Sequence, residues 1–260
     1  EACLVKYPDR VFEGGRIRDH GDIDPGGHDL SGCRIAELKD GIEHILLLLL
    51  DCAILGADLD PLLDLPGLFV FGSNDYYGPM LKNPFSYLTP DDGSRKLGKP
   101  LPSDELDIRL QGRGWINLNH SKQIITVSGV AIEVRGTDDA HLQLDDYSKV
   151  AGKKAKSCDI SIGVTHAPYK RIIDAMSADE LDMIFAGHTH GGQVRIPWFG
   201  GTRSLTTNCD LPNWRSRGLT KFGSEPYLHV SAGMGYNPYT PIRLLCPPEV
   251  SLITLIARQQ

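Results

Sequence analysis

Two closely spaced histidines, His188 and His190, are the strongest chemical signal in the chain. They stand in Gly187-His188-Thr189-His190-Gly191-Gly192-Gln193, directly after an apolar run that we interpret as a buried strand. The flanking glycines favour a turn on which both imidazoles aim into one pocket. Neutral imidazole nitrogen binds zinc, iron, manganese or nickel well. The motif therefore predicts a metal site.

A third histidine repeats this arrangement at the end of another strand. His166 lies in Thr165-His166-Ala167-Pro168, after the apolar run 159–164. In open parallel sheets such strand exits are where ligands bind. Asp51 follows the leucine run 45–50, and Asn74 and Asp75 follow the run 68–71. Polar residues thus stand at the exits of several predicted strands.

The elements that position these residues alternate between strand and helix. Apolar runs predict strands at 45–50, 68–71, 159–164, 181–185, 227–231 and 250–256, the first of them parallel and buried on both faces. Helical spacing or flanking signals predict helices at 35–45, 59–65, 103–112 (capped by Ser103) and 170–176, and Ser128-Gly129 predicts a hairpin of 124–127 with 131–134. This alternation predicts an α/β layered fold in a single domain over residues 1–260.

Residues 76–102 are rich in Pro, Gly, Asn and Asp and predict a long surface loop or lid. Its aromatic residues either line a pocket or only pin the loop to the body, and we leave both readings open: Tyr76, Tyr77, Phe85 and Tyr87. Peripheral membrane contact through this loop is a hypothesis.

Composition narrows the function classes. The net charge of −6 gives no basic excess for a polyanion, so we expect no nucleic-acid binding. The six cysteines form no CxxC pair, which argues against a disulfide framework or a structural zinc site and favours a reducing, cytoplasmic location. The apolar run 45–50 is far shorter than the roughly 20 residues that span a bilayer as a helix.

Four segments together resemble the calcineurin-like metallophosphoesterases, most closely their bacterial YkuE-like branch. They are GHTHGGQ, the upstream THAPY, GSNDYY, and HVSAGMG with the following PIR, and the resemblance covers about residues 66–256. It implies a four-layer αββα sandwich with mixed sheets and a site at the carboxyl ends of the strands. It also implies two divalent metal ions, Mn, Fe or Zn, as cofactors.

The resemblance implies ligands residue by residue. His190 would serve one ion, together with the two acids of a DxH-like motif and a bridging aspartate. His166 and His188 would serve the other ion with that same aspartate and an asparagine. An ungapped match puts Ser73 at the asparagine position, but a serine hydroxyl is a poor ligand, so we expect Asn74 to coordinate through a local shift. The histidine that usually donates a proton is then missing.

The N-terminal ligands match less closely. Asp51 stands where the bridging aspartate belongs, Asp22 where the first aspartate belongs, and Asp24 where the family has histidine. A carboxylate there would favour manganese or iron over zinc. The alternative is an exposed acidic turn before Pro25-Gly26-Gly27, with His20 and His28 as fallback ligands.

The resemblance implies a phosphoesterase that hydrolyses a phosphodiester or phosphomonoester of a small phosphorylated substrate through a metal-bridging hydroxide. The leaving group would take its proton from water, from Asp75, or from His141 or His120, which we expect to lie outside the site. The alternative is a divergent member that binds metal or a phosphorylated ligand without turnover, because two of the family's motifs are altered.

Overall fold

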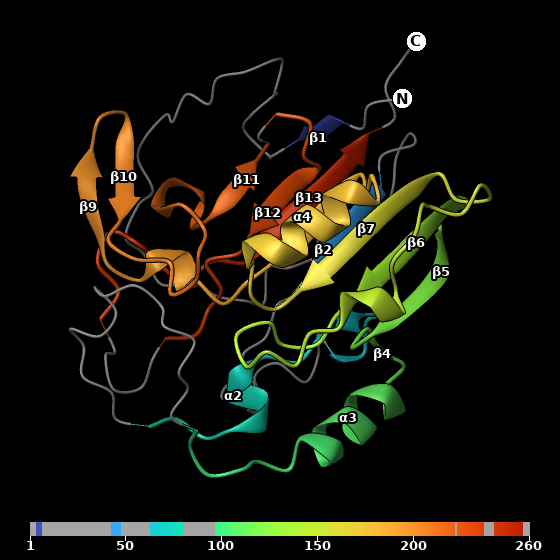
Figure 1. The fold of residues 1–260 in the computed structure, drawn as a ribbon, viewed down its shortest axis with the longest axis horizontal. Coiled ribbons are helices and arrows are strands. Elements are labelled where there is room, and N and C mark those ends of the chain that lie inside the picture. The colour runs from blue at the N-terminus through green and yellow to red at the C-terminus, as the bar shows by residue number, and fades with distance from the viewer. Residues whose placement is uncertain are drawn as a thin grey trace.

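The structure, a computed structural model, describes residues 4–6, 43–47, 63–80, 97–221, 223–236 and 242–256. Its centre is a six-stranded mixed sheet in the order β11-β12-β8-β7-β6-β5 (Figure 1). Its strands are β5 (Ser121–Val127), β6 (Val130–Gly136), β7 (Ile160–Thr165), β8 (Met183–Ala186), β11 (Gly218–Thr220) and β12 (Tyr227–Val230). The four inner strands β12, β8, β7 and β6 run parallel, so their carboxyl ends meet at one edge.

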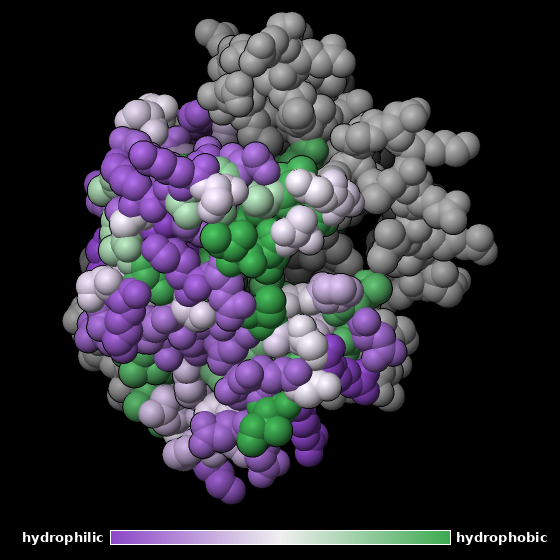
Figure 2. Space-filling view, turned by 90° about the vertical axis from the view of Figure 1, so that its right-hand side faces the viewer, coloured by the Kyte–Doolittle hydropathy of each residue, from purple (hydrophilic) through white to green (hydrophobic). Residues whose placement is uncertain are grey.

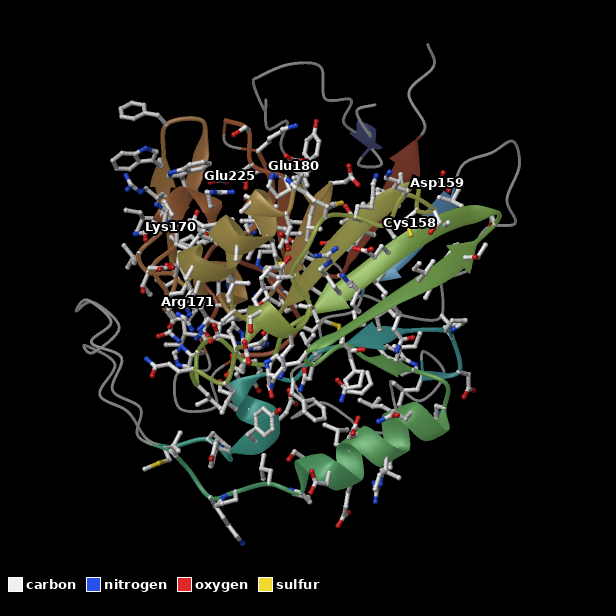
Figure 3. All side chains as sticks on the ribbon, turned by 45° about the vertical axis from the view of Figure 1, so that its right-hand side comes forward. Cys158, Asp159, Lys170, Arg171, Glu180 and Glu225 are labelled. Carbon is white, nitrogen blue, oxygen red and sulfur yellow. The ribbon has the colours of Figure 1, made fainter. Side chains whose placement is uncertain are left out.

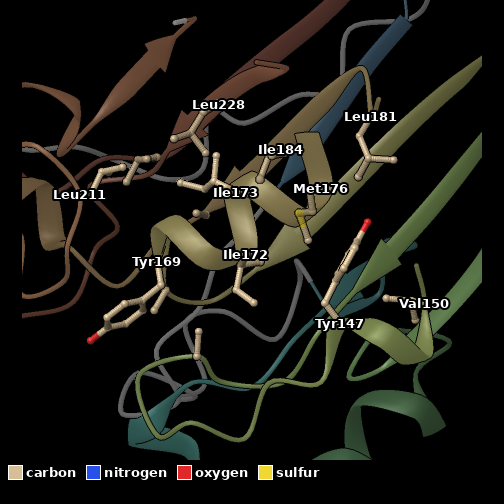
Figure 4. Packing of buried hydrophobic residues seen from close by; sticks show 14 residues of the cluster. Tyr147, Val150, Tyr169, Ile172, Ile173, Met176, Leu181, Ile184, Leu211 and Leu228 are labelled. Carbon is tan, nitrogen blue, oxygen red and sulfur yellow. The ribbon is translucent and has the colours of Figure 1, made fainter. Parts of the chain in front are cut away.

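One face of this sheet is covered by α4 (Lys170–Ala178). Ile172, Ile173 and Met176 of the helix pack in one cluster with Ile184 and Leu228 of the sheet (Figure 4). These helix residues recur at steps of one, three and four, which places them on one side of an α-helix. The helix predicted at 170–176 is confirmed and extends two residues further than expected.

The other face of the sheet packs against β3 (Leu68–Phe69), which pairs in parallel with β4 (Ile116–Asn117). Leu68 and Val70 belong to the cluster that includes Ile162 of the sheet. Phe69 and Phe71 instead pack with Leu110 of α3 (Ser103–Gly112), as expected when alternate side chains of an extended segment point to opposite faces.

A separate three-stranded sheet joins distant parts of the chain. It contains β1 (Leu4–Lys6), β13 (Ser251–Ile256) and β2 (Glu43–Leu47) in the order β1-β13-β2. Both neighbours of β13 run antiparallel to it. Ile253 of β13 belongs to the same hydrophobic cluster as Ile162, so this sheet also contributes to the core beneath the six-stranded sheet.

The α/β fold class is confirmed, with three corrections to the predicted elements. The strand predicted at 45–50 begins earlier, at Glu43, and pairs antiparallel, because its partner is the C-terminal strand β13. Ser103 is the first helical residue of α3 and Pro102 precedes it, so the predicted serine cap is wrong. The hairpin of β9 (Arg195–Trp198) and β10 (Gly201–Ser204) was not predicted. Residues 43–45 of the helix predicted at 35–45 belong to the strand β2, so the helix is wrong there, and the rest of it lies outside the described residues.

No helix among the described residues combines the length and the apolar character that crossing a membrane requires.

Candidate functional site

The candidate site lies where the parallel strands end. The segments that follow β6, β7, β8 and β12 begin at residues 137, 166, 187 and 231. Figure 3 shows this polarity on β7: Cys158 and Asp159 precede the strand at one end, and Lys170 and Arg171 begin α4 on the other side of the molecule. Three of the predicted histidines therefore come from two adjacent strand exits.

His166 and His188 face each other. His166 Nε2 lies 3.3 Å from His188 Nδ1. On its other side, His188 Nε2 lies 3.1 Å from the carbonyl oxygen of Asn208. A neutral His188 that donates from Nε2 to this carbonyl carries its lone pair on Nδ1, the atom that faces His166.

Burial lowers the pKa of His188 well below its ordinary value, and the neighbouring His141 and His166 lower it further. The ring is therefore neutral at pH 7, which is the state in which an imidazole binds a metal ion.

The turn that carries His188 and His190 has unusual backbone angles. His188 has φ of 66° and His190 has φ of 49°, the left-handed region that non-glycine residues rarely adopt. Thr189 secures the turn, since its hydroxyl accepts from Gly191 N and donates to Ser216 O at 2.6 Å. Strain held in this way is typical of functional sites.

His190 has its own partners. Its Nδ1 lies 3.0 Å from the carbonyl oxygen of Gly235, which also accepts from Arg243 Nε at 3.1 Å. Its own carbonyl oxygen accepts from the Cys246 thiol at 3.3 Å. With Nδ1 donating to Gly235, the lone pair of a neutral His190 lies on Nε2. The two histidines of the motif thus contact different backbone carbonyls.

His141 joins this group, contrary to the expectation that it lies outside the site. Its ring centroid is 4.4 Å from that of His188, and its Nδ1 lies 3.0 Å from the hydroxyl of Tyr169. The segment that carries it leaves β6 as the other histidine segments leave β7 and β8. The strand-exit rule could therefore have found it.

Asp139 holds this segment in place. Its carboxylate accepts from the backbone N–H of His141 at 3.0 Å, and its side chain is fully buried. Burial raises the pKa of Asp139, although the nearby His166 acts in the opposite direction.

The segment after β3 reaches the site through its backbone. A Cβ built on Gly72 would lie 2.3 Å from Cε1 of His166, so only glycine fits there. Asn74 lies in α2 (Ser73–Tyr76) and is exposed, while Asp75 is buried and accepts from Gly72 N at 2.7 Å. Asp75 thus positions the segment that contacts His166. Its role as proton donor, and metal binding by Asn74, stay predictions.

Tyr76 connects the start of the predicted 76–102 loop to this region. Its hydroxyl donates to the carboxylate of Asp138 at 2.9 Å and accepts from Asn119 Nδ2 at 3.1 Å, and its ring packs edge-on against Phe71. Of the two readings of the loop aromatics, this contact favours pinning for Tyr76. Phe85 and Tyr87 lie outside the described residues.

The pair of His166 and His188 fits a metal ion. Two nitrogen ligands of one tetrahedral ion at the usual bond length lie about 3.4 Å apart, close to the 3.3 Å between His166 Nε2 and His188 Nδ1. Within the described part of the chain, no three His, Cys, Asp or Glu side chains are grouped so that they could hold an ion. The predicted acidic ligands Asp22, Asp24 and Asp51 lie outside that part.

Histidines gather at the carboxyl edge of a mixed α/β sheet, and comparisons with known proteins identify relatives of the chain. The chain is 28% identical to YpbG of Bacillus subtilis over 189 residues, which is 71% of this chain and 60% of that protein. It is 26% identical to the metallophosphoesterase YkuE of the same organism, over 53% of this chain and 45% of that protein. It is 36% identical to the UDP-2,3-diacylglucosamine pyrophosphatase LpxG of Chlamydia trachomatis, over 28% of this chain and 22% of that protein.

These similarities relate the chain to the metallophosphoesterases of the calcineurin-like superfamily, including the YkuE-like branch. The relatives imply divalent metal ions as cofactors. The chain spans less than two thirds of the length of each of these three proteins. No family model and no solved structure matches it.

Proposed function

We propose that the chain is a phosphoesterase that depends on two divalent ions, Mn, Fe or Zn, and hydrolyses a phosphodiester or phosphomonoester. One observation carries the proposal: two imidazoles converge at adjacent strand exits, where Nδ1 of the neutral His188 lies 3.3 Å from His166 Nε2. When bound, divalent ions lower the pKa of water and neutralise the charge of a phosphate.

The residues of the chain have distinct roles in this proposal. His166 and His188 would hold one ion, and His190 would hold the other. The carbonyl oxygens of Asn208 and Gly235 orient the rings of His188 and His190 from behind, as backbone acceptors commonly do for metal-binding histidines.

The acidic ligands complete the proposed site. Asp51 would serve both ions, Asp22 and Asp24 would serve the ion held by His190, and Asn74 would serve the ion held by His166. We also propose that the chain forms a four-layer αββα sandwich in one domain, with residues 76–102 as a lid. We propose a cytoplasmic location for the protein.

The substrate in this proposal is a small phosphorylated molecule. The name of the Chlamydia trachomatis relative describes cleavage of a nucleotide-linked lipid, which supports diesters or lipid-linked phosphates as the substrate class.

The test is hydrolysis of bis(4-nitrophenyl) phosphate by metal-stripped protein with Mn²⁺, Fe²⁺ or Zn²⁺ restored, for the native chain and His188→Ala. We expect metal-dependent turnover that falls about 100-fold or more in the variant, because loss even of the groups behind a ligand costs roughly 10- to 100-fold. The matched control is His120→Asn, at a histidine whose Nε2 accepts from the backbone N–H of Asp146.

A second candidate is a divergent member that binds metal or a phosphorylated ligand without turnover. Two observations favour this candidate. Asn74, the predicted metal ligand, is exposed, and Asp75, the predicted proton donor, accepts a hydrogen bond from Gly72 N instead. Absence of diester hydrolysis with every metal, in a chain that still binds the metal, would favour this second function over the first.

A further inference from the structure

The β9–β10 hairpin projects from the body of the protein and carries an aromatic tip (Figure 1). Among the described strands, β9 and β10 pair only with each other. Trp198 and Phe199 stand at the tip with exposed fractions of 52% and 97%, and Gly200 makes the turn with φ of 78°. A phenylalanine that is almost entirely exposed contributes nothing to the core of its own chain.

Further apolar side chains lie along the hairpin and beside its base. Ile196 of β9 and Leu205 after β10 are exposed, and so is Trp214 in the short helix η7 (Asn213–Arg215). This helix is joined to the end of β10, since Ser204 Oγ donates to Asn213 O and Asn213 Nδ2 donates to Leu205 O, both at 2.9 Å. The aromatic tip therefore belongs to a larger exposed apolar surface.

This part of the chain is cationic in an otherwise acidic protein. Residues 195–221 contain five Lys or Arg and one acidic residue, Asp210, in a chain whose net charge is −6. Arg195 and Arg215 are buried and Arg215 is paired with Glu225 at 2.9 Å, so the cations accessible on this surface are Arg203, Arg217 and Lys221. Arg203 stacks over the ring of Trp198 at 5.2 Å, and Lys221 is exposed. On the opposite side of the molecule, hydrophilic side chains cover much of the described surface, with a hydrophobic band through its middle (Figure 2).

We propose that the β9–β10 tip docks on an anionic lipid bilayer. Exposed tryptophan and phenylalanine beside cationic side chains suit the interface between headgroups and acyl chains.

The hairpin directly contacts the turn that carries His188 and His190. Arg195 Nη1 at the start of β9 donates to Gly191 O at 2.7 Å, and a Cβ on Gly192 would meet Ser204 Cβ at 2.1 Å. Four strand residues span about 13 Å, so docking would hold the candidate site near the headgroups. Docking would also present a membrane-borne phosphate to the histidines, and this consequence rests on the proposed function. The docking proposal is independent of the proposed function.

The test is co-sedimentation of the full chain with vesicles of phosphatidylcholine alone or with 30% phosphatidylglycerol. We expect binding to the anionic vesicles that falls about tenfold or more in the double variant Trp198→Ser/Phe199→Ser. Ile108→Ser is the matched control, because Ile108 is 69% exposed on α3, away from the hairpin, and it should bind like the native chain. Circular dichroism checks that each variant is folded.

Three outcomes would overturn the docking proposal: no binding by the native chain, equal binding by the double variant, or self-association of the native chain that the double variant loses without any vesicle binding. Arg203→Gln is a second probe and should weaken binding to the anionic vesicles alone. Hydrolysis of a soluble diester by the native chain is measured separately. The docking proposal can therefore be tested even if the proposed phosphoesterase activity is absent.

Discussion

Gly72 touches the ring of His166, and this contact can be tested without changing a charged or metal-binding group. Its backbone angles, φ −115° and ψ 175°, suit any residue, so Gly72→Ala changes only the space beside His166. The new Cβ would lie within 2.6 Å of three ring atoms, so the imidazole or the backbone beside it must shift from the observed arrangement. We expect loss of metal-dependent turnover and weaker metal binding, measured by activity and calorimetric titration.

The control for this substitution is Gly112→Ala at the end of α3. No atom lies within 4 Å of a Cβ there, and alanine in a helix is about 0.5 to 1 kcal/mol more stable than glycine. Activity should be unchanged. If Gly72→Ala keeps full activity as well, the contact with His166 does not position the site.

His229 predicts an acid sensitivity of the fold. It is 1% exposed in β12, and burial lowers its pKa from 6.5 to about 4. Between these pH values His229 binds a proton in the unfolded chain but not in the folded chain. The contribution of His229 to the free energy of unfolding is therefore complete above pH 6.5 and is lost as the pH falls towards 4. A shift of this size corresponds to about 3 kcal/mol.

Urea unfolding from pH 7 to pH 4 measures this effect. In His229→Gln the free energy of unfolding should fall less over this range than in the native chain. Identical pH dependence of the two proteins would show that protonation of His229 does not cause the loss of stability at low pH.

At this scale, sequence reasoning placed His166 and His188 at the exits of two strands, because the motif and the strand before it are both local, and the structure shows that these strands are adjacent. It missed the contact between His141 and His188, which depends on β6 lying beside β7. It also could not show that Asn74 turns outward while Gly72 approaches His166.

At the scale of elements, a buried ion pair ties β6 to the end of α4. Arg135 is fully buried and donates to the carboxylate of Glu133, to Asp179 at 3.1 Å and to the carbonyl oxygens of Val150 and Gly152. Burial acts to raise the pKa of Glu133, but the hydrogen bond from Arg135 holds it below its ordinary value. Both groups therefore stay charged in the core.

Removal of one partner leaves the other charged and buried. Arg135→Met should lower the free energy of unfolding by about 3 to 5 kcal/mol, whereas the double variant Glu133→Leu/Arg135→Met should recover part of that loss. Chemical denaturation measures both. A double variant no more stable than the single one would mean that the hydrogen bonds to Val150 and Gly152, rather than the ion pair, carry the effect.

Most strands of the six-stranded sheet could be predicted, because they are buried on both faces and appear as apolar runs such as Ile160–Thr165. The hairpin of β9 and β10 could not, since Arg195–Trp198 contains a proline and is largely exposed, without a buried apolar pattern. The pairing direction of Glu43–Leu47 could not be read either, because apolarity does not reveal which strand is the neighbour.

At the scale of the whole molecule, metal binding should stabilise the fold. A ligand that binds only the folded state adds about 2.7 kcal/mol at 100 times its Kd. Saturating Mn²⁺ should therefore raise the melting temperature of the metal-stripped chain, and it should do so much less in the double variant His166→Ala/His188→Ala. Equal shifts in both proteins would place the ion elsewhere.

The central claim is that the convergent histidines form a two-metal centre, and elemental analysis of the purified chain tests it most directly. The native chain should hold two ions, and His166→Ala/His188→Ala should hold at most one, with both proteins folded by circular dichroism. A native chain without bound metal, or a double variant that keeps both ions, would contradict the account.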